Sequence, residues 1–81
     1  MRIDFTDHAK ERMALRNVKV RDVHLAIAKG KVGKNHHGHF VLAFIPNVRR
    51  DYPLQVSFAA ENTKTGPAVV VKTVFWKGLK D

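Results

Sequence analysis

Two segments near the N-terminus show the spacing of amphipathic helices. Thr6 is a suitable N-cap and Asn17 a suitable left-handed stop, so the pattern predicts a helix over about 7–16. Over 20–29 the apolar positions again fall on one stripe, and Gly30 follows as a natural C-cap. Only a short link separates the two segments, which predicts a helix hairpin.

After Gly30 the pattern changes from helical spacing to the runs and alternations of strands. The segment 31–38 is a polar connection containing glycine, with room for one short strand at its start. The residues that follow form apolar or alternating runs rich in β-branched and aromatic side chains. They predict three antiparallel strands joined by short hairpins, at about 39–46, 53–60 and 68–76.

Simple alternation assigns the two faces of each predicted strand. In the middle strand Leu54, Val56 and Phe58 share one face, and Gln55 and Ser57 lie on the other. In the last strand alternation places two sets of four residues on opposite faces: Val69, Val71, Thr73 and Phe75, against Val70, Lys72, Val74 and Trp76.

Two amphipathic helices followed by a strand meander can bury their apolar stripes only against one face of the sheet. The sequence therefore predicts a single α+β domain over residues 1–81, with an N-terminal helix hairpin packed on one face of a three- to four-stranded antiparallel sheet. The other face is expected to stay open. The predicted core includes Met13, Val23, Ile27, Leu42, Phe44, Val56, Phe58 and Val71.

The composition narrows the class of partner. Fifteen Lys and Arg residues against seven Asp and Glu residues give a formal charge of +8. Such an excess favours a polyanion, because cations that neutralise phosphates release counterions; a charge that only keeps the protein soluble is the alternative. We therefore expect RNA as a partner. We expect no membrane partner, since no apolar run approaches the roughly 20 residues of a membrane span.

The termini and the absence of cysteine add two expectations. Without cysteine the chain has no disulfide and no thiolate chemistry. The N-terminus begins directly with Met1 and a charged residue and carries no apolar signal segment, so a cytoplasmic location is expected.

A stripe of basic side chains is the strongest candidate site. At 100° per residue, His8, Arg12 and Arg16 fall within one arc of the first helix, next to its apolar residues. Two permanent cations beside a group that can transfer a proton suit the binding and cleavage of a phosphate ester. In the alternative, the arginines reach the surface or cap strand carbonyls, and the histidine only packs.

Three further groups are candidates for contact with nucleic acid. His36 and His37 lie in a glycine-containing loop with a third histidine, His39, but no carboxylate or cysteine stands at a ligand spacing, so neither a metal site nor any other cofactor is expected. Arg49 and Arg50 lie at a hairpin tip beside a tyrosine. Lys72 interrupts an apolar strand beside Thr73, where it belongs to the open sheet face or reaches past an edge.

The stretch from Phe5 to Val18, with its His-x3-Arg-Met-x2-Arg pattern, resembles the small prokaryotic family called domain of unknown function 4258. The second helix and the ending Val70-Val-Lys-Thr-Val-Phe75 extend the resemblance over most of the chain. That family is similar in turn to the RelE and barnase-like ribonuclease toxins. The resemblance implies a RelE-like fold with RNA on the open sheet face, and a site containing His8, Arg12 and the 72–73 strand. It assigns no catalytic glutamate, since Glu11 is expected to face outward and Glu61 to lie near a turn.

The function that follows is a metal-independent endoribonuclease of toxin type, in which a ribose 2′-hydroxyl attacks the adjacent phosphate. The reaction needs a base, an acid and cations around the developing charge. His8 or a loop histidine would transfer protons, and Arg12, Arg16 and Lys72 would stabilise the phosphate. The alternatives are a non-catalytic nucleic-acid-binding module and a small protein-interaction domain that binds a cognate antitoxin. The sequence does not predict the oligomeric state.

Overall fold

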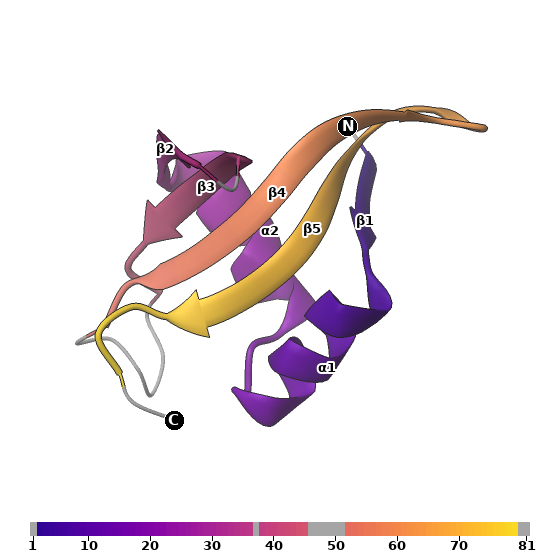
Figure 1. Ribbon diagram of the computed structural model, residues 1–81. Helices are drawn as coiled ribbons and strands as arrows, with labels where there is room; N and C mark the ends of the chain where they lie inside the picture. The colour runs from indigo at the N-terminus through magenta and orange to yellow at the C-terminus, as the bar shows by residue number, and fades with distance from the viewer. Residues whose placement is uncertain (1, 37, 46–51, 80–81) are drawn as a thin grey trace.

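The computed structural model describes residues 2–36, 38–45 and 52–79. Its strands form one sheet in the order β1-β5-β4-β3-β2 (Figure 1). Along the chain the elements are β1 (Arg2–Phe5), α1 (Asp7–Leu15), α2 (Val20–Lys29), β2 (Lys31–Asn35), β3 (Gly38–Ala43), β4 (Leu54–Thr63) and β5 (Gly66–Trp76).

The two predicted helices are confirmed, with the local signals that marked them. The Thr6 hydroxyl caps α1 by accepting a hydrogen bond from the Ala9 backbone nitrogen at 3.0 Å. Asn17 adopts the left-handed conformation with φ 55°, which ends the helical path. At the start of α2 the Asp22 carboxylate accepts from the Lys19 backbone nitrogen at 3.0 Å. Local capping therefore fixes both helices.

The predicted sheet is wrong. The chain does not begin with the helix hairpin, because β1 precedes α1 and pairs in parallel with β5, with Ile3 opposite Val69 and Phe5 opposite Val71. At the far side, β2 forms an antiparallel edge strand beside β3. The sheet is therefore five-stranded and mixed, in place of a three- to four-stranded antiparallel sheet. A strand of four residues is too short to give an alternation signal, and the polar β2 resembles a loop.

In the view of Figure 1, α2 lies behind the sheet and α1 lies below β5 and β1. α1 packs along β5, and α2 packs on β3 and β4. The core lies between the helices and the sheet, and its side chains include Ala9, Met13, Val23, Ala26, Val41, Leu54, Val56, Val71, Val74 and Trp76. The sheet face toward the viewer in Figure 1 carries no helix of the described chain.

A β-bulge divides β5. Ser57 of β4 lies opposite Thr73, but its neighbour Phe58 lies opposite Val71, so Lys72 is an extra residue in the ladder. Alternation is shifted by one position there, and the prediction that placed Val71 and Val74 on opposite faces is wrong. Both are fully buried in the core.

The bulge also anchors the first helix. The Thr6 backbone nitrogen donates to the Val71 carbonyl at 3.1 Å, and the Thr6 hydroxyl donates to the Lys72 carbonyl at 3.3 Å. The residue that caps α1 therefore also binds the irregular point of β5. These bonds fix the start of the helix beside the extra lysine.

The predicted core is correct in part. Four of its members are buried, whereas Phe44 is 69% exposed. Val41 and Ile45 point toward the helices, so alternation turns Phe44 to the opposite side. The buried members are Met13, Val23, Val56 and Val71; Ile27, Leu42 and Phe58 are half-buried.

Candidate functional site

Arg16 of the predicted basic stripe holds the edge of β5. Its guanidinium donates to the Val74 carbonyl at 2.8 Å, and its own carbonyl accepts from the Trp76 indole at 2.8 Å. β1 pairs with β5 only as far as Val71, so the edge beyond that point is completed by side chains of the helix region. This geometry is the capping of strand carbonyls that the sequence left open as an alternative.

Arg12 and His8 lie nearer the bulge. Arg12 is half-buried on α1, and its guanidinium has no hydrogen bond or ion pair with any described residue. His8 is exposed in the first turn, two residues after Thr6, which contacts Lys72. The eight residues from His8 to Arg16 span about 12 Å of helix. The structure therefore brings His8 and Lys72 to the same end of α1 and places Arg16 at the other end.

Lys72, the extra residue of the bulge, forms an ion pair with β4. Its Nζ lies 2.8 Å from Oε2 of Glu61, and the two side chains are 47% and 44% exposed. Glu61 belongs to β4 and lies near its end at Thr63, as expected, but nothing in the spacing connects it with Lys72. An ion pair this exposed contributes little stability, so a phosphate can compete for the lysine at small cost.

A hollow of about 620 Å³ lies on the helix-free face of the sheet next to Lys72. β4 presents the small side chains Ser57 and Ala59 there, between larger neighbours, which leaves the space open. Thr73 and Phe75 of β5 complete its lining on one side. Of these residues the sequence identified only Lys72 and Thr73, because short polar and aromatic side chains in a strand carry no motif.

Gln55 lies in the same hollow and is 8% exposed. Its Cα pairs with those of Phe75 and Leu42, so the three side chains form a row across β5, β4 and β3. The side-chain amide has no hydrogen bond with any described residue. Every fully enclosed side-chain nitrogen or oxygen in the described chain has a partner, so the Gln55 amide must open into the hollow.

The histidines are dispersed. His39 lines the hollow, and its ring stacks on Phe58 with a centroid separation of 5.9 Å and an interplanar angle of 25°. His36 is exposed after β2. His37, Arg49 and Arg50 lie outside the described residues. Within the described ranges no group of three or more His, Cys, Asp or Glu side chains is arranged to hold a metal ion.

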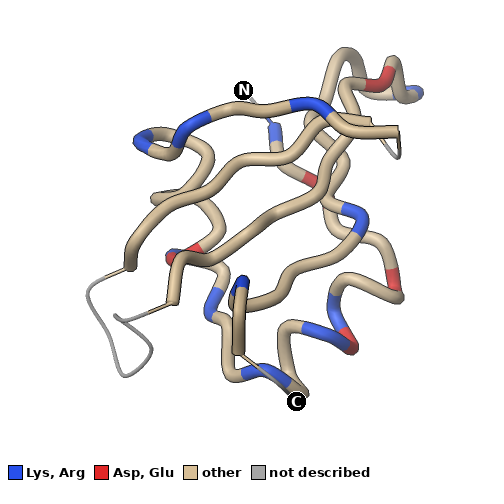
Figure 2. Tube along the Cα trace, turned by 60° about the vertical axis from the view of Figure 1, so that its left-hand side comes forward, with Lys and Arg blue, Asp and Glu red and all other residues tan. Residues whose placement is uncertain are grey.

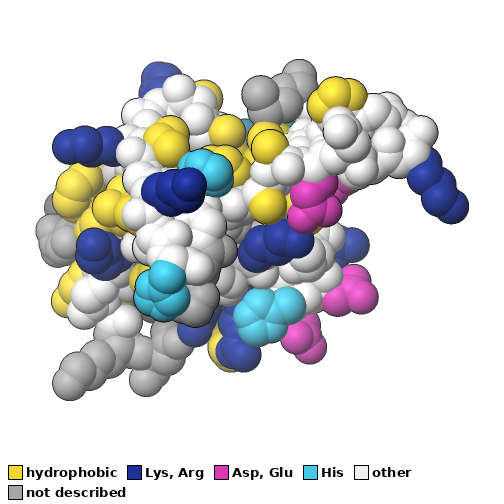
Figure 3. All heavy atoms as spheres, turned by 45° about the horizontal axis from the view of Figure 1, so that its top comes forward, with side chains coloured by type: hydrophobic (Ala, Val, Ile, Leu, Met, Phe, Trp, Pro, Cys, Tyr) yellow, Lys and Arg dark blue, Asp and Glu magenta, His cyan; other side chains and the backbone are white. Residues whose placement is uncertain are grey.

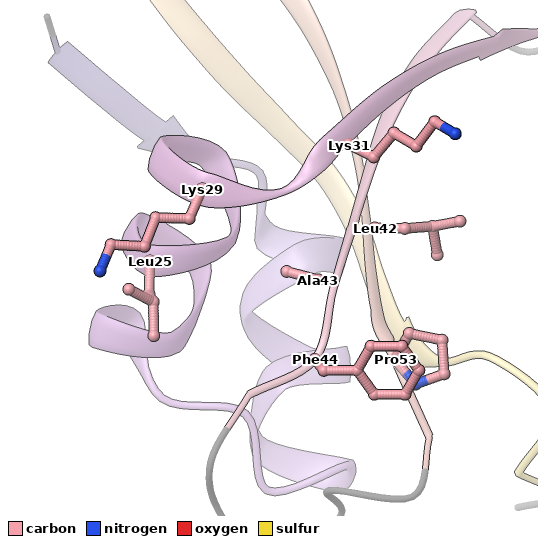
Figure 4. A pocket seen from close by; sticks show the side chains of 7 residues that line it. All are labelled: Leu25, Lys29, Lys31, Leu42, Ala43, Phe44 and Pro53. Atoms are coloured by element: carbon pink, nitrogen blue, oxygen red, sulfur yellow. The ribbon is translucent and has the colours of Figure 1, made fainter.

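A second hollow, of about 610 Å³, lies where α2 meets the end of β3 (Figure 4). Leu25 and Lys29 approach it from α2, and the rings of Phe44 and Pro53 lie together on its opposite side. Lys31 lies at its margin, at the start of β2. This hollow is apolar and is flanked by two lysines.

The basic residues are spread over the whole chain. Figure 2 shows Lys and Arg positions on helices and strands alike, and Figure 3 shows acidic side chains gathered mainly at the right of its view. No helix in the described ranges is both long and hydrophobic enough to cross a membrane.

Comparison with known proteins identifies a family. The family described as "Domain of unknown function (DUF4258)" matches residues 5–76, which extend from the end of β1 through the last residue of β5. No curated protein and no solved structure matches the chain. Because the match covers most of the sequence, including both helices and the bulge, the chain belongs to the DUF4258 family.

Proposed function

We propose that this protein binds RNA on the helix-free face of its sheet and cleaves it without a metal ion. The observation that carries the proposal is the hollow beside the bulge, where Lys72 lies next to the polar Ser57 and Thr73 and the aromatic Phe75. Aromatic and basic side chains on an open sheet are the usual means of holding unstacked RNA bases and their phosphates. The charge of +8 supports the same partner.

The chemistry proposed is an internal transfer at phosphorus. A base removes the proton of a ribose 2′-hydroxyl, the 2′-oxygen attacks the adjacent phosphorus, and the 5′-oxygen leaves with a proton from an acid. The products are a 2′,3′-cyclic phosphate and a 5′-hydroxyl. The resemblance to ribonuclease toxins supports this reaction, and its need for proton transfer and cations matches the residue types at the site.

The proposed roles go to residues of the hollow and to residues of α1, the helix that packs along β5. Lys72 and Arg12 would stabilise the phosphate, since Lys72 is held only by an exposed pair and Arg12 has no partner among the described residues. His8, at the bulge end of α1, and His39, in the hollow, are the two candidates for proton transfer. Arg16 would position α1, because its guanidinium already binds the Val74 carbonyl.

The test is incubation of the purified protein with mixed RNA in EDTA, followed by analysis of the new ends. We expect cyclic phosphate and 5′-hydroxyl ends, and binding whose log–log salt slope is roughly −3 to −5 if several phosphates are neutralised on a single strand. Lys72→Ala should lose activity, and Lys64→Ala, an equal charge change in the β4–β5 turn, should retain it. Binding without cleavage would leave the non-catalytic module, and an absence of both would refute the proposal.

The apolar hollow of Figure 4 favours a second candidate, a protein-interaction domain. Phe44 is 69% exposed beside it, and Lys29 and Lys31 suit a partner segment with apolar and acidic side chains, such as that of a cognate antitoxin. Co-expression with the product of the adjacent gene tests this. We expect Phe44→Lys to abolish co-purification and Lys72→Ala to leave it intact; equal behaviour of the two variants would exclude the hollow as the binding surface.

A further inference from the structure

We infer that the hollow on the helix-free face is an adenine-binding site, in which the Gln55 amide reads the base edge and Phe75 stacks on its face. The inference rests on the proposed function, since it assigns a base preference to the RNA bound there. Three features support it: the Gln55 amide, the side chains that flank this amide, and the position of Lys72.

The Gln55 amide has no partner in the described chain and is open to the hollow. Gln55 is 8% exposed, yet its amide has no hydrogen bond with a described residue. A buried amide destabilises a fold unless something satisfies it, and buried side-chain amides normally have partners. Since the amide opens into the hollow, a ligand that enters the hollow can form hydrogen bonds with it.

The neighbours of the amide suit a flat heterocycle. Phe75 and Leu42 are the direct cross-strand neighbours of Gln55, so an aromatic and an aliphatic side chain flank the amide on the same sheet face. The next row along the strands contains Ser57 and Thr73, whose small side chains leave room for a ring. A base stacked on Phe75 would therefore present its edge to the Gln55 amide.

The donor and acceptor pair of the amide matches adenine. An amide offers an oxygen acceptor and an NH₂ donor side by side. Adenine presents a complementary pair, the N6 amino donor beside a ring-nitrogen acceptor, and amide side chains bind adenine in this bidentate manner in nucleic-acid complexes. We therefore assign adenine to the hollow, and the other three bases, which also carry adjacent donors and acceptors, are the comparison that tests the assignment.

Lys72 lies where the backbone of the same RNA strand would run. The row of Ser57 and Thr73 separates Gln55 from the bulge, which corresponds to about 7 Å along β4. A nucleotide whose base occupies the hollow can therefore place its phosphate toward the ammonium group. The Gln55 amide, the Phe75 ring and the Lys72 ammonium group would thus bind one nucleotide. The adenine preference should therefore apply to a single base of the bound strand.

The experiment measures fluorescence anisotropy of decamers with 2′-O-methyl ribose, which lack the attacking hydroxyl and so remain intact. One probe contains only uracil, and three others carry a single central adenine, cytosine or guanine. We expect the adenine probe to bind about tenfold more tightly than the uracil probe. Gln55→Met should reduce this ratio to below twofold, and Asn62→Ala, an exposed amide of β4, should preserve it.

The outcomes separate the two proposals. Salt-dependent binding of all four probes with equal affinity, or a preference for another base, would overturn the adenine site and leave the proposed function standing. A preference for adenine that persists in folded Gln55→Met would also overturn it. If the wild-type protein bound none of the four probes, RNA binding itself would be refuted, and this inference with it.

Discussion

The backbone carbonyl of Arg16 accepts a hydrogen bond from the indole of Trp76, 60 residues later in the chain, at 2.8 Å. The Arg16 guanidinium donates in the opposite direction, to the carbonyl of Val74. Two hydrogen bonds thus tie the end of α1 to the end of β5. This connection covers the part of the strand edge that β1 does not reach.

Loss of the indole donor should destabilise the fold. Trp76→Phe keeps a ring in the core but leaves the Arg16 carbonyl without its partner, so we expect the free energy of unfolding to fall by about 1–3 kcal/mol. Urea unfolding measures the change. The neighbouring exposed substitution Lys77→Ala should shift the midpoint little, and a Trp76→Phe midpoint equal to that of wild type would contradict the structural role.

The Glu61–Lys72 pair predicts a gain of affinity. Glu61→Gln releases the lysine and removes a negative charge near the bound phosphate, an effect on the order of 1 kcal/mol. RNA affinity at low salt should rise about threefold to tenfold. Glu11→Gln on the exposed face of α1 is the matched control, and a rise of equal size in both variants would show that only net charge matters.

Lys72→Ala should weaken binding and flatten its salt dependence. Removing one phosphate contact from a single-stranded complex lowers the log–log slope by about 0.7. Titrations of labelled RNA at several salt concentrations give both quantities. A slope identical to that of wild type would place Lys72 away from the phosphates.

Arg12→Ala should lower cleavage far more than binding. A cation directed at the transition-state phosphate acts on charge that develops during the reaction, and its loss costs about tenfold to a thousandfold in rate. Single-turnover cleavage and anisotropy separate the two effects, with Lys10→Ala as the control on the same helix. Wild-type cleavage by folded Arg12→Ala, verified by a thermal melt, would remove Arg12 from the site.

The pH–rate profile distinguishes the two histidines. If His8 is the base, its deprotonation produces the acidic limb, so His8→Ala should lower the rate and flatten that limb while His39→Ala keeps it. The reverse result would assign the base to His39. An unchanged acidic limb in both variants would exclude both.

Gln55→Met should stabilise the free protein. Gln55 is largely buried and its amide has no partner in the described chain, so an apolar chain of similar length removes part of a desolvation cost, and we expect a gain of about 1 kcal/mol in urea unfolding. Asn62→Ala should change stability little, since Asn62 is exposed. A loss of stability in Gln55→Met would mean that the amide is satisfied within the folded chain.

Local features were predictable from the sequence, and long-range pairings were not. Thr6 and Asn17 mark the ends of α1 because capping depends on neighbouring residues. The pairing of β1 with β5 joins the two ends of the chain. The only sign of β1 in the sequence is the short alternation that places Ile3 and Phe5 on one face. Nothing local distinguishes such a strand from an N-terminal extension.

The candidate site likewise combines a residue that the sequence marks with residues that only the strand pairing brings to it. Lys72 is conspicuous in the sequence because it interrupts an apolar run, and the structure places it in the hollow. Its partner Glu61 and its neighbour Gln55 lie on another strand and become significant only through the register of β4 and β5. A site assembled across strands cannot be recognised from spacing along one of them.

The extra residue in β5 also makes the strand tolerant to one change of length. Val71 and Val74 are three positions apart, whereas uninterrupted pleating would bring neighbouring core residues two apart. Deletion of Lys72 would therefore restore the two-residue alternation of the strand, and every side chain that faces the core would still face it. Elsewhere in the strand, the same deletion would turn the core outward. Position 72 is thus where the hairpin can gain or lose its lysine with the hydrophobic core intact.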